Sequence, residues 1–132
     1  MNVLLIDDEP EIPEILKEFL ELKNHTVTTA SNGKKVLDAV LADNDFDIAF
    51  SDIMMPKMNG LTFLDKVRSN NLNLPVILIS DQEDLESSIR ALKLGALDFI
   101  VKPVYLKTLE QTIQKVDTAL AAERETLGAQ SQ

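Results

Sequence analysis

The sequence of 132 residues contains no cysteine, so it can form neither a disulfide nor a thiolate metal site. No apolar run approaches the roughly 20 residues that a bilayer-spanning helix needs. The first residues have the pattern of a strand followed by acids, which is not the pattern of a signal peptide. We therefore expect a soluble, cytoplasmic protein with no membrane segment.

Basic residues are scarce relative to acidic ones. The chain has 13 Lys and Arg against 22 Asp and Glu, a net charge of −9. Such a chain repels phosphate backbones, so direct nucleic-acid binding by it is disfavoured, whereas a cation or a basic partner suits it. With 45% apolar and 27% charged residues, the composition is that of one globular domain with a real core.

Segments of strand length alternate with segments whose apolar residues recur at helical spacing. The predicted strands are residues 3–6, 26–30, 46–50, 75–80 and 99–102. The apolar stripes between and after them are Ile12, Ile15, Leu16, Phe19 and Leu20; Val36, Leu37, Val40 and Leu41; Leu61, Phe63, Leu64 and Val67; Leu85, Ile89 and Leu92; and Leu106, Leu109, Ile113, Val116 and Leu120. This alternation predicts a single α/β domain, a parallel sheet covered by helices on both faces.

Two local signals refine the helices. Gly95 is placed to cap the C-terminal end of the fourth predicted helix. Pro13 is tolerated only near a helix start, so the first helix must begin at or after Pro10, or its first turn is distorted.

Asp52 stands where the third predicted strand ends, and Pro56 and Gly60 then mark a loop. A carboxylate at the C-terminal end of a buried strand points into the crevice where open α/β sheets bind ligands. The simpler alternative is a solvated loop aspartate, which is common. The other strand ends decide between the two.

Polar side chains also follow three further predicted strands. The first strand ends in Asp7 and Asp8, the fourth in Ser80, and the fifth in Lys102 followed by Pro103. Taken singly, an aspartate pair can be a helix cap, a serine a turn residue and a lysine a surface residue. Together, the C-terminal ends of parallel strands bring three carboxylates, a hydroxyl and an ammonium to one edge.

This combination favours phosphoryl chemistry. Neighbouring carboxylates repel unless a cation lies between them, and a small set of oxygen ligands suits Mg²⁺ better than Zn²⁺. An aspartate can accept a phosphoryl group as an acyl phosphate when a metal and a lysine neutralise the charge. We interpret Asp52 as the acceptor, Asp7 and Asp8 as metal ligands, and Ser80 and Lys102 as phosphoryl contacts.

Over about residues 2–120 the chain resembles the receiver domain of two-component response regulators. The motifs that carry the resemblance are Asp7-Asp8-Glu9-Pro10, the segment from Ser51 to Gly60, Ser80 and Lys102-Pro103. The resemblance implies a flavodoxin-like doubly wound domain with five parallel strands in the order 2-1-3-4-5 and five helices.

The resemblance also implies functional roles. Asp52 would be phosphorylated by a sensor histidine kinase, a phosphotransfer protein or a small phosphodonor, with Mg²⁺ required. The backbone carbonyl of Met54 would join Asp7, Asp8 and Asp52 around the metal. The chain would then catalyse only its own phosphoryl transfer and a slow autodephosphorylation, and would not be an enzyme in the ordinary sense.

The implied switch lies beside this site. The Lys102–Pro103 bond would be cis, and Phe99 would be the aromatic that swings inward as Ser80 moves toward the phosphoryl group; a plain core role for Phe99 remains open. The reporting face would comprise the fourth helix, fifth strand and fifth helix. Charges that could pair there across a homodimer, or simply be solvated, are Arg90, Lys93, Asp98 and Lys107.

Residues 2–122 are the expected receiver domain, and residues 123–132 a C-terminal tail or linker stub, polar and frayed from Gly128. A stand-alone receiver and a fragment of a longer regulator with an output domain both remain open. Two other functions compete. A pseudo-receiver without phosphoryl chemistry is favoured only by Asp81, an acid that should repel incoming phosphate. A haloacid-dehalogenase-like phosphatase would need a second aspartate where Met54 stands.

Overall fold

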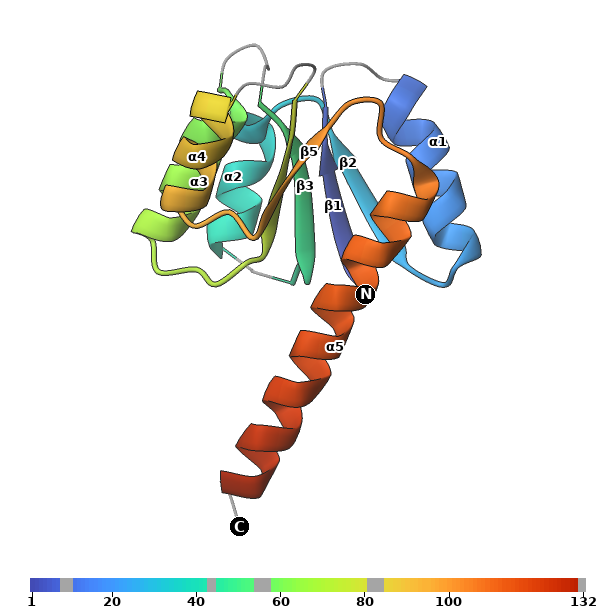
Figure 1. The fold of residues 1–132 in the computed structure, drawn as a ribbon, viewed down its shortest axis with the longest axis vertical. Helices are drawn as coiled ribbons and strands as arrows, with labels where there is room; N and C mark the ends of the chain where they lie inside the picture. Colours follow the sequence, from blue (N-terminus) through green and yellow to red (C-terminus); the bar gives the residue numbers. More distant parts are fainter. Residues whose placement is uncertain (8–10, 43–44, 54–57, 81–84, 131–132) are drawn as a thin grey trace.

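The computed structural model describes residues 1–7, 11–42, 45–53, 58–80 and 85–130. Within these ranges strands and helices alternate strictly along the chain (Figure 1). The elements are β1 (Asn2–Ile6), α1 (Glu11–Leu22), β2 (Thr26–Ala30), α2 (Gly33–Ala42), β3 (Ile48–Asp52), α3 (Gly60–Ser69), β4 (Val76–Ser80), α4 (Leu85–Lys93), β5 (Asp98–Val101) and α5 (Leu106–Gln130). The predicted alternation of five strands and five helices is confirmed.

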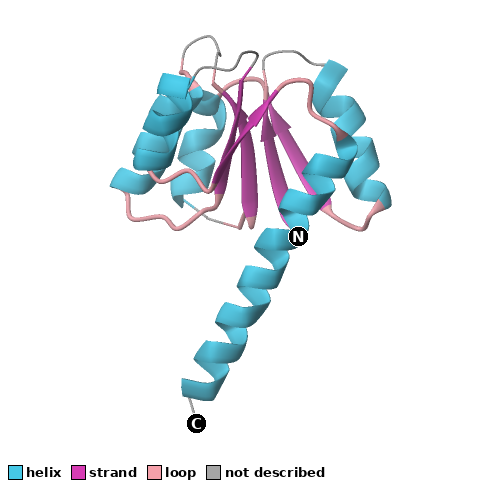
Figure 2. Cartoon of the chain, viewed as in Figure 1, coloured by secondary structure: helices cyan, strands magenta, loops and turns pink. Residues whose placement is uncertain are grey.

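All strand pairs are parallel, and the sheet order is β2-β1-β3-β4-β5. The register places Ile6 beside Ser51, Asp52 beside Ile79, and Ser80 beside Val101. The C-terminal ends of the strands therefore meet at one edge of the sheet (Figure 2). The predicted flavodoxin-like order is confirmed.

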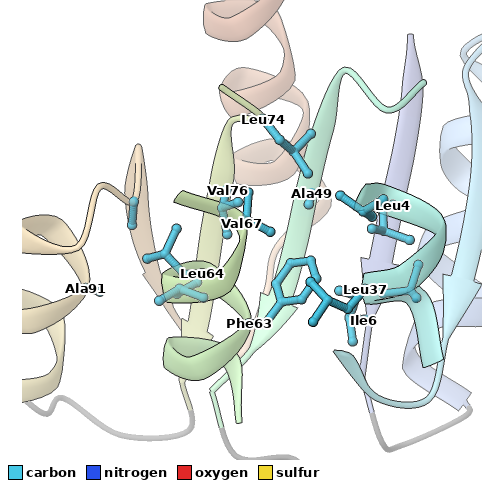
Figure 3. Close-up of a cluster of buried hydrophobic side chains, with 14 of the residues drawn as sticks. Leu4, Ile6, Leu37, Ala49, Phe63, Leu64, Val67, Leu74, Val76 and Ala91 are labelled. Carbon is cyan, nitrogen blue, oxygen red and sulfur yellow. The ribbon is translucent and has the colours of Figure 1, made fainter. Parts of the chain in front are cut away.

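Helices cover both faces of the sheet, with α1 and α5 on one side and α2, α3 and α4 on the other (Figure 1). Every residue of β3 and of β4 is buried, as expected for central strands of a parallel sheet. Because successive side chains alternate between faces, Ala49 packs with the α2–α3–α4 cluster and Phe50 with the α1–α5 cluster. Figure 3 shows Phe63, which is fully buried, near the sheet in the first cluster.

Five of the predicted stripe residues whose side chains are described are exposed and not core residues. Ile15 of α1 is 62% exposed, Leu41 of α2 and Leu106 of α5 are each 37% exposed, and Ile89 and Leu92 of α4 are 45% and 53% exposed. Among the described side chains of α4, Ala91 alone is buried, so a small residue provides the inward contact. The apolar spacing correctly located these helices but assigned too wide a face to the core.

The ends of two helices bear on the sequence predictions. Helix α1 begins at Glu11, which leaves Pro13 in the first turn as required. Helix α5 continues to Gln130 and projects beyond the lower end of the sheet (Figure 1). Residues 128–130 are thus helical here, and the boundary after residue 122 falls inside α5, so the division into receiver and tail stays a prediction. In the described part of the chain, the helices are too short or too polar to cross a bilayer.

Candidate functional site

Asp52 is the last residue of the central strand β3, and only 4% of it is exposed. The backbone around it is fixed on the β4 side, where Ile53 donates a hydrogen bond to the Ile79 carbonyl at 2.9 Å. A carboxylate in so buried a position needs a compensating cation or hydrogen bonds. The structure supplies a cation from another strand end.

Lys102 follows β5 and reaches across to β3. Its Nζ donates a hydrogen bond to Asp52 Oδ2 at 3.1 Å and lies 3.9 Å from Asp7 Oδ2. All three side chains are largely buried, with exposed fractions of 15% for Lys102, 5% for Asp52 and 10% for Asp7. The lysine ammonium therefore holds two carboxylates from separate strands at one point.

The backbone of each partner is anchored by a neighbouring strand. The Lys102 amide donates to the Ser80 carbonyl at 2.7 Å, and the Asp7 amide donates to the Ala30 carbonyl at 3.1 Å. The Lys102–Pro103 peptide bond is cis, the isomer that the resemblance implies. The strand ends thus bring Asp7, Asp52 and Lys102 together, as the sequence predicts.

Ser80 and Phe99 belong to β4 and β5, the two strands that follow β3 in the sheet. Ser80 is buried at the end of β4, one residue beyond the Ile79 that pairs with Asp52. Phe99 is half-buried on β5, pairs with Leu78 and packs against the α2–α3–α4 cluster. A core role explains this packing of Phe99, and its role as a switch stays a prediction.

Gly60 has a function in the site that the sequence pattern does not reveal. Its amide donates to the Ile53 carbonyl at 2.9 Å, which brings the start of α3 against the end of β3. A Cβ atom at position 60 would lie 2.5 Å from the backbone oxygen of Asp52. Only glycine allows this approach, and Asn59 completes the helix start by accepting a hydrogen bond from the Thr62 amide at 2.8 Å.

The oxygen atoms available at the site can be compared with the ligands that the expected Mg²⁺ prefers. Asp7 and Asp52 supply carboxylate oxygens near one point, which fits a hard cation such as Mg²⁺. Two other expected ligands, Asp8 and the Met54 carbonyl, lie outside the described residues, as does Asp81. No group of three His, Cys, Asp or Glu able to hold a metal is present among the residues that are described.

A groove opens from the site between α1 and the segment that joins β5 to α5. Its volume is about 510 Å³. It is lined by Asp7, Ile15, Leu16, Ile79, Lys102, Pro103, Val104 and Leu106. The exposed Ile15 forms one wall, so an apolar surface lies directly beside the charged centre.

The fold is a doubly wound α/β domain with a lysine and two carboxylates at the strand ends, and known proteins share this fold. The structure resembles the receiver domain of the Francisella response regulator 1452 with a TM-score of 0.83 and 30% identity, covering 90% of this chain and 98% of that one. It also resembles the chemotaxis protein CheY4 of Vibrio cholerae, with a TM-score of 0.79 and 30% identity over 87% of this chain and 97% of that one.

Sequence comparison assigns the family. The response regulator receiver domain profile matches residues 3–114, and the chain belongs to this family. It is 33% identical to the response regulator SaeR of Staphylococcus aureus over 90% of this chain and 51% of SaeR. It is also 33% identical to the probable transcriptional regulator ycf27 of Cyanidium caldarium over 87% of this chain and 45% of ycf27. The chain thus spans about half the length of these relatives.

Proposed function

We propose that Asp52 accepts a phosphoryl group from a sensor histidine kinase or phosphotransfer protein and thereby switches a partner or output domain. The observation that carries this proposal is the Lys102 ammonium placed 3.1 Å from Asp52 and 3.9 Å from Asp7. A structural ion pair would need one carboxylate. The second carboxylate, directed at the same point, suits a site where a divalent cation and a phosphoryl group share the charges.

The reaction is a transfer from nitrogen to oxygen. A carboxylate oxygen of Asp52 attacks the phosphorus of a phosphohistidine, the phosphorus–nitrogen bond breaks, and the electron pair leaves on the donor imidazole. The product is an acyl phosphate on Asp52. Lys102 and the Ser80 hydroxyl stabilise the charge on the transferring oxygens. Bound Mg²⁺, held by Asp7 and Asp52 with Asp8 and the Met54 carbonyl, would neutralise further negative charge.

The groove beside the site supports a protein donor. A donor side chain must reach a buried aspartate, and the groove between α1 and the β5–α5 segment opens beside Asp7 and Lys102. Its apolar wall, which includes Ile15 and Leu106, provides surface that a protein partner can cover. Small phosphodonors would use the same opening.

The output surface is proposed to be the α4–β5–α5 face. Phosphorylation adds a local dianion, which must favour one of two arrangements of a neighbouring element. Arg90, Lys93 and Lys107 are exposed there and Asp98 is half-exposed, so they are available to pair in a homodimer. We propose that residues 2–122 form the receiver domain, that residues 123–132 form a linker, and that the protein is cytoplasmic. The greater length of the relatives favours an output domain in a longer protein.

Incubation with acetyl phosphate and Mg²⁺, followed by intact mass, tests the proposal against its two competitors. One phosphoryl adduct on the parent chain, lost in Asp52→Asn and kept in Asp65→Asn, is the expected result. Asp65 is a matched control because it is an exposed aspartate on α3. No adduct under any condition would favour a pseudo-receiver, and sustained turnover of acetyl phosphate would favour a phosphatase.

A further inference from the structure

A hydrogen-bond clasp, part-buried at Leu72 and exposed at Gly95, ties the C-terminal end of α4 to α3. Arg68, in the last turn of α3, donates to the Gly95 carbonyl from Nη2 at 2.9 Å and from Nε at 3.2 Å. Its Nη1 donates to the Leu72 carbonyl at 2.9 Å. One guanidinium therefore joins α3, the loop before β4 and the turn after α4. Burial lowers the pKa of Arg68, but an arginine remains charged at neutral pH.

The turn that receives Arg68 is itself strongly specified. Gly95 has a φ of +101°, and a Cβ there would lie 2.9 Å from Arg68 Nε. The Ala96 amide donates to the Ala91 carbonyl at 3.0 Å, and the Gly95 amide to the Leu92 carbonyl at 3.1 Å. These bonds form a Schellman motif, and the cation lies at the negative end of the helix dipole.

The described side chains of α4 and of the turn after it are buried to different extents along the helix. Toward its C-terminal end, Ala91 is fully buried and Ala96 nearly so, and the Leu97 amide donates to the Val76 carbonyl of β4 at 2.9 Å. From Glu86 to Arg90 no side chain is buried. The segment from Glu86 to Arg90 lies toward the end of α4 that follows Ser80 and β4 along the chain (Figure 1).

We propose that Arg68 is a positioning residue that makes the Gly95 turn the fixed pivot of α4, so that the helix moves at its site-proximal end. That this motion follows phosphorylation rests on the proposed function; the pivot itself does not. A lysine cannot replace the arginine, since a single ammonium cannot reproduce three hydrogen bonds from a planar fork.

Hydrogen exchange on the unphosphorylated chain tests the clasp. Arg68→Met and Arg68→Lys should both speed exchange of the Gly95 and Ala96 amides about tenfold or more, because charged hydrogen bonds are lost. Lys66→Met, at an exposed position in the same turn of α3, should leave these amides unchanged. Unchanged exchange in Arg68→Lys, whether or not Arg68→Met folds, would overturn the clasp.

Paired spin labels test the pivot, and the absence of native cysteine makes the labelling clean. One label at Glu18 of α1 is combined with a second at either Glu86 or Lys93, the two exposed ends of α4. Without any phosphodonor, the distance distribution should be broad for Glu86 and narrow for Lys93, and Arg68→Lys should broaden the Lys93 distribution. Equal widths in the parent chain, or no effect of Arg68→Lys, would refute the pivot.

A phosphodonor arm then separates the two proposals. When intact mass shows an adduct, the Glu86 distance should shift and the Lys93 distance should not; equal shifts would contradict the pivot. When no adduct forms, the proposed function fails, while the widths measured without donor still decide the pivot.

Discussion

Replacement of Lys102 by methionine should destabilise the fold, because the carboxylates of Asp7 and Asp52 would then repel each other without a lysine ammonium to pair with them. At an effective dielectric constant of about 20, unit charges 3.1 and 3.9 Å apart attract by about 5 and 4 kcal/mol before the cost of desolvation is counted. Removing one partner of a buried pair costs about 3–5 kcal/mol. Because Lys102 keeps some solvent contact, we expect Lys102→Met to lower the free energy of unfolding by about 3 kcal/mol without metal.

The assay is urea unfolding followed by circular dichroism, in EDTA and in saturating Mg²⁺. Metal bound only to the folded state should stabilise the parent by about 2.7 kcal/mol at 100 times its Kd. In Lys102→Met the gain should be larger, because the metal then replaces the cation that pairs with Asp7 and Asp52 among the described residues. Adding Asp52→Asn to Lys102→Met should restore much of the lost free energy of unfolding, since it removes one of the two negative charges that repel each other. Lys66→Met serves as the surface control.

The reasoning fails if Lys102→Met unfolds with the parent free energy in EDTA. It fails equally if Asp52→Asn does not rescue Lys102→Met, because the two effects would then be independent. Strong coupling between the two substitutions is the signature of the geometry described above.

Three further predictions follow from other parts of the fold. Gly60→Ala should destabilise by about 1–3 kcal/mol and slow adduct formation, because its Cβ would meet the Asp52 backbone; normal urea unfolding and kinetics would contradict this. Phe63→Ala should lower the free energy of urea unfolding by about 3–5 kcal/mol, while the adduct still forms on Asp52. A loss below about 1 kcal/mol would show that Phe63 is not a core residue. Burial and then the neighbouring N-terminal ammonium lower the pKa of His25 below 6.5, so folding disfavours its protonation. Stability should therefore fall as the pH drops from about 7 through that lowered pKa, and His25→Asn, compared by thermal unfolding across this range, should have a shallower slope.

The fold was predictable because the strands are short and bounded by clear turn residues, and because β1, β3 and β4 are buried along nearly their whole length. The strand 26–30 was placed at its observed limits, whereas the third strand was placed two residues early because Phe46 extends the apolar run. The sheet order came from the resemblance, since alternation alone is compatible with several orders.

The site was predictable to the level of strand ends and not beyond. The parallel sheet brings Asp7, Asp52 and Lys102 together from distant parts of the sequence. This could be predicted because all three residues stand at the C-terminal ends of predicted strands. The tight contact at Gly60 and the Arg68 clasp depend on backbone carbonyls, which leave no pattern in the side-chain sequence. A glycine at the end of α4 was read correctly as a cap, but its arginine partner was not foreseen.

The most direct test of the account is to locate the phosphoryl group chemically. The chain is treated with acetyl phosphate and Mg²⁺, the acyl phosphate is reduced with borohydride, and the converted residue is found by peptide mass spectrometry. The account predicts conversion of an aspartate to homoserine at position 52 alone, dependent on Mg²⁺ and greatly slowed in Lys102→Met. Conversion at another acidic residue, or none in the presence of Mg²⁺, would contradict it.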